Sequence, residues 1–516
     1  MADKGLKPGA LGLFSSVVIG LASTAPAYSL AATLGVIVGI VAFQSPIIIV
    51  LAFVPMLLIA YGYKELNRAD PDCGTTFTWA SRAFGPRTGW IGGWGIVAAD
   101  IIVMANLAQI AGAYGFQLVG ADGLATNTTW ITVVGVLWIA LMTLICYIGI
   151  EISANLQKVL LTIEVVMLFV LAVTALVKVY GGTAPGVSSH IEWSWFNPFK
   201  IDSVDALTKG MLAGIFIYWG WDTAVSVNEE TRDRDRTPGR AAVISTVVLL
   251  LVYLMVTVSA QAFAGVGDKG IGLGNPDNSG DVLSGLGHEV FGTGDWGSTA
   301  TKLLILMVLT SAAASTQTTI LPTARTTLAM ASYKAVPRQF ARMHPRFLTP
   351  TWSTVGMGLA SIAFYVVLTR VSENVLADSI GSVGLMIAFY YGLTGFACVW
   401  YYRKVLTRSA RDLWFKGVLP GLGGLLLLYF FVNACHVYAE ADYGSTSWTL
   451  PFAPHWQLGG VFVTGIGALL LGAILMVLCR VVKPGFFHQE TIPRSAYRPA
   501  ADREEAGPDD VRGDHG

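Results

Sequence analysis

Two stretches interrupt long apolar runs of this chain: Gly20-Leu21-Ala22-Ser23-Thr24-Ala25-Pro26 and Tyr218-Trp219-Gly220-Trp221-Asp222-Thr223. The first lies in the run from about residue 11 to 40, and the second lies in the run from about 206 to 228. Bilayer hydrocarbon cannot hydrogen-bond a free backbone, so a helix broken at that depth must line a cavity within the protein. Paired breaks in corresponding segments of two halves of a chain point to a transporter's substrate site. The two stretches therefore predict a ligand site where the breaks meet.

The composition excludes an ordinary soluble protein. Of the 516 residues, 54% are apolar and 13% are charged, which is far from the balance of globular domains. A membrane-spanning helix needs about 20 apolar residues, and runs of this length predict an all-α integral membrane protein with twelve transmembrane helices. The first run is longer than a signal-peptide core, so we interpret it as a retained helix. The runs lie near residues 11–40, 45–63, 88–117, 129–149, 155–179, 206–228, 241–265, 299–332, 351–371, 377–402, 413–436 and 457–482.

Lysine and arginine predict the orientation. If the N-terminus is cytoplasmic, 27 of the 33 Lys and Arg residues fall inside and 6 fall outside, as expected for inner loops. We expect a multi-pass protein of the plasma membrane with cytoplasmic N- and C-termini. Its predicted parts are a cytoplasmic lead, a core of ten helices, two further helices and a disordered cytoplasmic tail. These parts cover residues 1–10, 11–404, 405–483 and 484–516.

Motifs of other protein classes are absent from the sequence. Without a Gly-x-x-x-x-Gly-Lys-[Ser/Thr] loop, we do not expect ATP-driven transport by this chain alone. The histidines are isolated and form no Ser/His/Asp pattern, so we predict neither an enzyme nor a bound cofactor. The five cysteines follow no metal-binding spacing, so we predict no metal site. The expected partners are a small amino acid or amine, a proton or Na⁺, and the lipid bilayer, but no nucleic acid.

Asp222 is the first candidate substrate-binding residue. A charged side chain deep in a span costs about 3 kcal/mol on insertion scales, so it is kept where it faces a cavity or a partner. Unwound backbone beside it can offer carbonyl and N–H groups to a ligand, and the carboxylate suits an ammonium group. Alternatively, Asp222 only caps the broken half-helix. Aromatic residues that could supply cation–π faces or a lid are Phe216, Tyr218, Trp219 and Trp221.

Two further acids lie deep in predicted spans. Asp100 follows Gly89, at the start of the third span, by 11 residues, which places it roughly 16 Å deep at about 1.5 Å per residue. It is a second candidate amine ligand or proton acceptor, unless it only bonds a neighbouring helix in its protonated form. Glu164 has no basic residue within one helical turn, and a low dielectric favours its neutral form. It could take up and release a proton during transport, or only form a stabilising hydrogen bond.

Hydroxyl residues are candidates for ion and substrate contact at two places. The eighth span carries Ser315 and Thr316, whose hydroxyls could coordinate Na⁺ together with carbonyls of the first break. Small hydroxyl residues also pack transmembrane helices closely, which is the alternative. The first break offers Ser23 and Thr24, and a half-helix N-terminus there would favour a substrate carboxylate.

The chain resembles the amino acid–polyamine–organocation permease family across nearly the whole membrane region, and three motifs carry this resemblance. The first, at 65–94, contains Pro71-Asp72-Cys73-Gly74 and Gly92-Gly93-Trp94, with Cys73 at a usual glycine and Phe77 at a usual tyrosine. The second, at 216–238, contains Gly220-Trp221-Asp222 and Asn228-Glu229-Glu230-Thr231. The third, at 323–340, contains Thr323-Ala324-Arg325 and Val336-Pro337-Arg338-Gln339-Phe340.

The resemblance implies a five-plus-five inverted repeat of the leucine-transporter type, with broken first and sixth helices, two additional helices and alternating access. Asp222 matches the acidic position of members that carry amines and arginine. Asp100 resembles an aspartate of relatives similar to putrescine importers. Proton-coupled relatives have a lysine where this chain has Glu164. The family's substrate contacts fall here on Ser23, Thr24, Ala25, Phe216 and Gly220.

We therefore expect a secondary active permease for an amino acid or organic amine, with a preference for cationic amines. Coupling to protons through Glu164 is expected, with Ser315 and Thr316 as further coupling candidates. The alternatives are a neutral amino acid permease and a Na⁺-coupled or exchange mode. A sensor or channel of the same fold is a further rival, but the sequence shows neither a long cytoplasmic domain nor a ring of charges.

Overall fold

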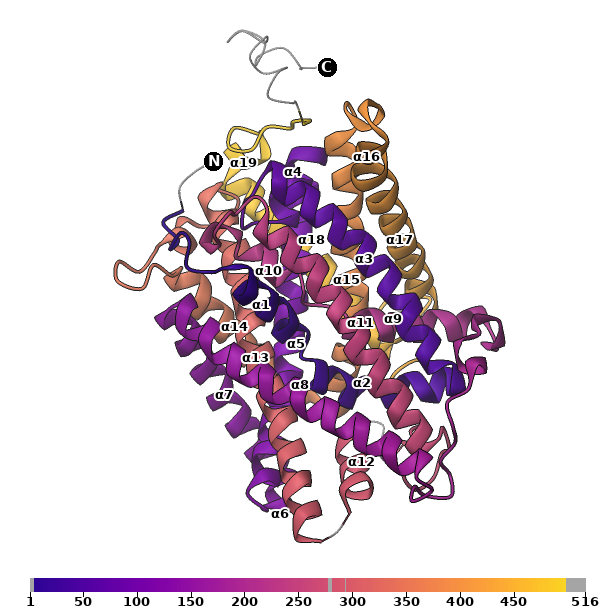
Figure 1. Ribbon diagram of the computed structural model, residues 1–516. Coiled ribbons are helices and arrows are strands. Elements are labelled where there is room, and N and C mark those ends of the chain that lie inside the picture. The colour runs from indigo at the N-terminus through magenta and orange to yellow at the C-terminus, as the bar shows by residue number, and fades with distance from the viewer. Residues whose placement is uncertain (1–3, 277–280, 293, 498–516) are drawn as a thin grey trace.

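The computed structural model describes residues 4–276, 281–292 and 294–497, and these form an almost entirely helical bundle (Figure 1). A two-stranded antiparallel sheet pairs β1 (Ser447–Thr449) with β2 (Gln457–Gly459). The α-helices are α1 (Leu13–Thr24), α2 (Pro26–Val41), α3 (Ser45–Ala69), α4 (Thr76–Phe84), α5 (Pro86–Leu118), α6 (Asp122–Ala125), α7 (Thr128–Ile148), α8 (Ile150–Tyr180), α9 (Val204–Ile217), α10 (Thr223–Ser226), α11 (Thr237–Ala264), α12 (Val282–Phe291), α13 (Asp295–Ser332), α14 (Thr351–Val371), α15 (Glu373–Tyr402), α16 (Ala410–Asp412), α17 (Leu419–Val437), α18 (Gly460–Val482) and α19 (Pro484–Phe487). Shorter 3₁₀ turns and one π-helical segment, Leu413–Val418, connect them.

Ten helical runs in the described chain are long and apolar enough to cross a membrane. One run, Leu13–Ala69, contains α1, α2 and α3, whereas α9, with 14 residues, is not among the ten. Large apolar side chains on the outside of the bundle are exposed, such as Val432 at 60% and Val481 at 78%. Such a surface suits lipid better than water. The structure thus confirms the predicted all-helical class with many apolar helices.

The first apolar run is broken between α1 and α2. Helix α1 ends at Thr24, Ala25 takes a left-handed conformation with φ 45° and ψ 67°, and Pro26 begins α2. Proline lacks the N–H that would continue the hydrogen-bond ladder, and it disfavours helical geometry in the residue before it. Ser29 Oγ donates a hydrogen bond of 2.6 Å to the carbonyl of Thr24. The break therefore satisfies one of its free acceptors from within the chain.

The second break lies between α9 and α10, where residues 218–222 form turns. Gly220 has a φ of 119°, which side chains of L-residues rarely adopt. A Cβ atom at this position would lie 2.8 Å from the carbonyl carbon of Ser23. The two breaks therefore touch each other, and Gly220 is what permits their close approach.

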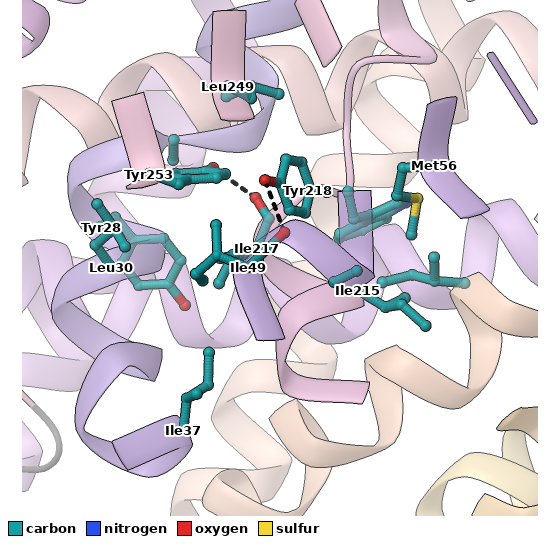
Figure 2. Packing of buried hydrophobic residues seen from close by; sticks show 14 of the residues in the cluster. Tyr28, Leu30, Ile37, Ile49, Met56, Ile215, Ile217, Tyr218, Leu249 and Tyr253 are labelled. Atoms are coloured by element: carbon teal, nitrogen blue, oxygen red, sulfur yellow. Dashed lines mark hydrogen bonds between the residues drawn. The ribbon is translucent and has the colours of Figure 1, made fainter. Parts of the chain in front are cut away.

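Buried tyrosines satisfy backbone acceptors near the second break (Figure 2). The Tyr253 hydroxyl on α11 donates to the carbonyl of Ile217, the last residue of α9. The Tyr218 hydroxyl donates to the carbonyl of Ile49 at 3.1 Å, and the two tyrosine rings meet edge to face with centroids 5.1 Å apart. An unpaired carbonyl in these apolar surroundings would cost several kcal/mol, so the tyrosines help to hold α9 at its broken end.

One end of the bundle holds both ends of the described chain, and we call it the terminal face. It contains Lys4, Asp72, Arg82 and Ser495; the Ser495 N–H donates to the Arg82 carbonyl at 3.0 Å, and Lys4 Nζ donates to Asp72 at 2.8 Å. Figure 1 shows the first and last described segments at this end.

A cluster of buried charged side chains lies at the terminal face. Lys4 Nζ bonds both Asp72 and Glu229, and the Tyr333 hydroxyl donates to Asp72 at 2.7 Å. The side chains of Lys4 and Asp72 are only 1% and 0% exposed. Burial by itself would raise the pKa of Asp72, but the charge of Lys4 and the hydrogen bonds from Lys4, Tyr333 and the Gly74 N–H together hold this pKa below its ordinary value.

A second buried ion pair ties together two of the sequence motifs. Arg325 on α13 donates through Nε and Nη2 to both carboxylate oxygens of Glu230, at 3.0 and 2.9 Å. This two-bond geometry is strong and directional. The Leu11 N–H donates to the Glu230 carbonyl at 3.0 Å. The segment before α1 is thus bound to the same residue that pairs with Arg325.

Replacing Lys4 with Met should destabilise the protein, because Asp72 and Glu229 would lose their buried cation. Removing one partner of a buried pair costs roughly 3–5 kcal/mol, which thermal unfolding of the detergent-purified protein would measure. Since Lys4 lowers the pKa of Asp72, its stabilising contribution is complete above the unfolded carboxyl pKa of about 4 and is lost as the pH falls through the lower native pKa. The difference in stability between the wild type and the Lys4→Met variant should therefore become smaller at acidic pH.

The control for this prediction is Lys7→Met. Lys7 pairs with Glu151 at 2.7 Å, but the two side chains are 45% and 51% exposed. Exposed pairs contribute little, so this variant should melt close to the wild type. Equal losses in both variants would contradict the role given to Lys4.

Candidate functional site: a closed cavity between two helix breaks

A small cavity lies where the two breaks meet. Only about 10 Å³ of it is open to the centre of a water molecule, which is room for about one water. The site is therefore closed in this conformation and must widen before a larger ligand can bind. Its lining comes from α1, α5, the second break, α10, α13 and α15: Ser23, Ile96, Asp100, Trp219, Gly220, Asp222, Thr223, Thr319, Pro322 and Tyr390.

Asp222 is held by two tyrosines of α15. The Tyr391 hydroxyl donates to Oδ1 at 2.8 Å, and the Tyr390 hydroxyl donates to Oδ2 at 3.2 Å. Trp219 Nε1 in turn donates to the Tyr390 oxygen. Although Asp222 stands at the N-cap of α10, its side chain makes no capping hydrogen bond there. The carboxylate thus points across the cavity toward α15.

Asp100 reaches the same cavity from α5. It is 3% exposed, and the Thr323 hydroxyl on α13 donates to its Oδ2. Among the described residues, no Lys, Arg or His forms an ion pair with Asp100 or Asp222. A buried carboxylate without a cation is costly when charged. Two such groups around one cavity can bind a cationic ligand or hold a proton.

Glu164 lies outside the cavity lining but holds the first break. Its Oε1 accepts the Ala27 N–H at 2.6 Å and the Ser311 hydroxyl at 2.8 Å. Ser311 Oγ also accepts the Tyr28 N–H at 3.2 Å. Helix α8 thereby supplies the acceptor for the free N-terminus of α2, which would otherwise remain unsatisfied. Glu164 Oε2 is buried and has no hydrogen-bond partner among the described residues.

The two hydroxyl candidates of α13 point in different directions. Ser315 Oγ donates to the Ser23 carbonyl at 3.2 Å and so contacts the first break. Thr316 Oγ1 donates to the carbonyl of Ala312 at 2.6 Å and accepts from Trp138 on α7 at 3.3 Å. Ser315 is therefore beside the break, whereas Thr316 faces α7.

The remaining predicted substrate contacts do not line the cavity between the breaks. Thr24 Oγ1 donates to the Leu21 carbonyl at 2.7 Å within α1, and Ala25 forms the break itself. Trp221 is fully buried against Tyr63 and Tyr391. Phe216 lines a separate cavity of about 600 Å³ toward the end opposite the terminal face.

Sequence reasoning missed three residues that hold the two acids, namely Thr323, Tyr390 and Tyr391. Two adjacent tyrosines inside an apolar span are a signal, since a buried tyrosine hydroxyl requires a partner. The sequence does not show that this partner is Asp222, which precedes Tyr391 by 169 positions.

Comparison with known proteins identifies the family of the chain. The sequence model described as amino acid permease matches residues 10–476. The low-affinity putrescine importer PlaP of Escherichia coli (strain K12) is 22% identical, covering 82% of this chain and 88% of the importer. The branched-chain amino acid permease BcaP of Lactococcus lactis is 23% identical, covering 72% and 78%. The vacuolar cationic amino acid transporter 4 of Arabidopsis thaliana is 26% identical, covering 66% of this chain and 54% of that protein.

The match to the sequence model spans most of the chain and both helix breaks. The chain belongs to the amino acid permease family of the amino acid–polyamine–organocation superfamily. It is a multi-pass membrane protein of a transporter family, not an enzyme.

Proposed function

We propose that the protein is a secondary active carrier that moves an amino acid or organic amine across the membrane by alternating access. The proposal includes twelve transmembrane helices, with a five-plus-five inverted repeat of the leucine-transporter type and two additional helices. The pairs α1–α2 and α9–α10 are then its broken first and sixth helices. Their contact at Gly220 and Ser23 supports this assignment, because the ligand site of such a carrier lies between the two breaks.

The substrate preference rests on one observation, which is that two buried acids line the central cavity without a cation partner in the described chain. A cationic amine would compensate Asp100 and Asp222, and Trp219 offers an aromatic face beside them. The likeness to a putrescine importer and a cationic amino acid transporter supports this preference. The likeness to a branched-chain amino acid permease favours a neutral substrate, which is the second candidate.

Proton coupling is assigned to Glu164. As a carboxylate it accepts hydrogen bonds from α2 and α13 at once, and a proton on Oε1 or Oε2 would weaken one of these bonds. Protonation would then loosen the first break from α13. The rival is Na⁺, which Ser315 and the Ser23 carbonyl would bind, with Thr316 as a further predicted ligand.

The cellular arrangement is proposed from charge. We place the protein in the plasma membrane with the terminal face in the cytoplasm, because most Lys and Arg residues then lie inside. The lead at 1–10, the transport core at 11–404 and helices 11 and 12 at 405–483 keep their predicted roles. The tail at 484–516 was predicted to be disordered, but its first part is ordered and includes α19. Residues 484–497 of this tail pack on the terminal face, where Phe486 is fully buried, and 498–516 lie outside the described residues.

Uptake into proteoliposomes tests the proposed function. The purified protein should accumulate labelled putrescine or arginine when the outside is more acidic than the lumen, and an ionophore that collapses the gradient should stop accumulation. Unlabelled leucine should compete at least about tenfold less well than putrescine, because it leaves the buried acids uncompensated. Equal competition by leucine would favour a neutral substrate. Accumulation that depends on a Na⁺ gradient would show that Na⁺, and not the proton, is the coupling ion. Uptake no greater than in protein-free liposomes would refute carrier function.

A further inference from the structure

A second cavity on the terminal face collects positive charge. It lies between the end of α3, the start of α11 and the short helix α16, and it offers about 300 Å³ to the centres of water-sized molecules. Five of its six lining residues are basic, and we call it the basic pocket. The lining residues are Lys64, Arg68, Asp235, Arg236, Arg240 and Arg411.

The charge of the basic pocket is poorly compensated. Asp235 lies 3.8 Å from its neighbour Arg236, and both side chains are about half exposed or more. Asp412, next to Arg411, already bonds Lys416 at 2.6 Å. No carboxylate within the described ranges forms an ion pair with Lys64, Arg68 or Arg240. The basic pocket therefore has more positively charged side chains than carboxylates to pair with them.

The fold brings these cations together at an unfavourable place. Arg236 is the N-cap of α11, Arg240 lies one turn further, and the first turn contains no acidic residue. The N-terminus of a helix carries partial positive charge and normally attracts acids. Gly239 lets α3 and α11 approach closely, since a Cβ there would lie 2.7 Å from the Lys64 Cα. An anion in the pocket would offset both the arginines and the helix end.

The surroundings of the pocket identify the kind of anion. Directly after Arg411 and Asp412, the chain presents Leu413 and Trp414 with 43% and 54% of their surface exposed. Tyr61 on α3 packs edge to face on Phe415, with ring centroids 5.1 Å apart. An exposed tryptophan with a half-buried tyrosine beside it is typical of the boundary between lipid and water. A ligand with a charged head and an apolar tail would match both the pocket and this border.

We propose that the basic pocket binds the phosphate group of an anionic phospholipid from the leaflet at the terminal face. Lys64, Arg68, Arg240 and Arg411 would donate to the phosphate oxygens, and the acyl chains would lie along Leu413 and Trp414. In the proposed orientation this is the cytoplasmic leaflet, where basic pockets between transmembrane helices bind anionic head groups. The proposal does not depend on which substrate the central cavity takes.

Native mass spectrometry of the full-length protein in detergent would test this binding. The probes are dioleoyl phosphatidylglycerol, dioleoyl phosphatidylcholine and inorganic phosphate. The variant R68Q/R240Q/R411Q removes three charges of the pocket, and R338Q/R342Q/R346Q removes three exposed charges elsewhere on the same face. Retention of phosphatidylglycerol should fall at least about tenfold in the first variant and less than about twofold in the second. The lysine variant R68K/R240K/R411K, which keeps the charge, should retain the lipid.

The outcomes separate the possible occupants. Equal retention of phosphatidylglycerol by the pocket variant and the control variant would refute the site. Inorganic phosphate that displaces the lipid at equal concentration would show a site for free anions and overturn the lipid assignment, as would equal retention of phosphatidylcholine. If the triple glutamine variant does not fold, Arg411→Gln alone in the exposed α16 should still lower retention, and no change would refute the proposal.

Discussion

Asp222→Asn should lower uptake of putrescine and arginine by about 10- to 100-fold, mainly by raising KM. The asparagine oxygen can still accept the hydrogen bond from Tyr391, whereas its amide nitrogen can only donate, so the Tyr390 hydroxyl must turn to accept at that position. The variant therefore keeps the size of the side chain but removes its charge. A hydrogen bond to a charged group contributes about 1.5–3 kcal/mol, which corresponds to this range of affinity. Initial rates of labelled uptake into proteoliposomes would measure the effect.

Asp202→Asn is the matched control, because Asp202 is exposed and lies before α9, outside the cavity lining. Its uptake should match that of the wild type. Leucine uptake provides the second comparison and should be unchanged or raised in Asp222→Asn. Full uptake of cationic amines by this variant would show that Asp222 has only a structural role.

Glu164→Gln should abolish accumulation driven by a proton gradient while exchange of substrate across the membrane continues. Glutamine retains a carbonyl oxygen that can accept from Ala27 and Ser311, but it cannot take up a proton in the relevant pH range. The variant should therefore lose accumulation driven by the pH gradient but keep the exchange of labelled for unlabelled substrate. Parallel measurements of labelled substrate with and without an imposed pH gradient would show this separation.

The control lies on the same helix. Glu151→Gln changes an exposed acid of α8 that pairs with Lys7, and it should leave gradient-driven accumulation intact. If Glu164→Gln still accumulates substrate along a pH gradient, the proton is carried elsewhere, with Asp100 as the next residue to change. If a Na⁺ gradient drives the wild type, Ser315→Ala becomes the informative variant.

The helix breaks could be predicted because their cause is local. Pro26 ends α1 through its own covalent geometry, and Gly220 permits a backbone conformation that other residues avoid. Burial of Asp100 and Glu164 was also expected from their positions within apolar runs, and both side chains are buried. Local chemistry thus predicted where the chain is irregular and which acids are buried.

The partners of those acids could not be predicted, because they come from distant parts of the chain. Glu164 meets Ala27 across 137 positions, and Thr323 meets Asp100 across 223. Which hydroxyl faces an acid depends on the rotation of each helix, and α13 has no apolar stripe that would fix its rotation, since hydroxyls lie on several of its faces. Ser315 and Thr316 are adjacent in sequence, yet only Ser315 reaches the first break.

The burial of Lys4 has a practical consequence for producing the protein. The Lys4 side chain is only 1% exposed and is paired with Asp72. An affinity tag fused directly before residue 4 would therefore need space next to this buried ion pair and could disrupt it. A fusion at the C-terminus leaves the residues before Lys4 unchanged, and expression yields should favour it.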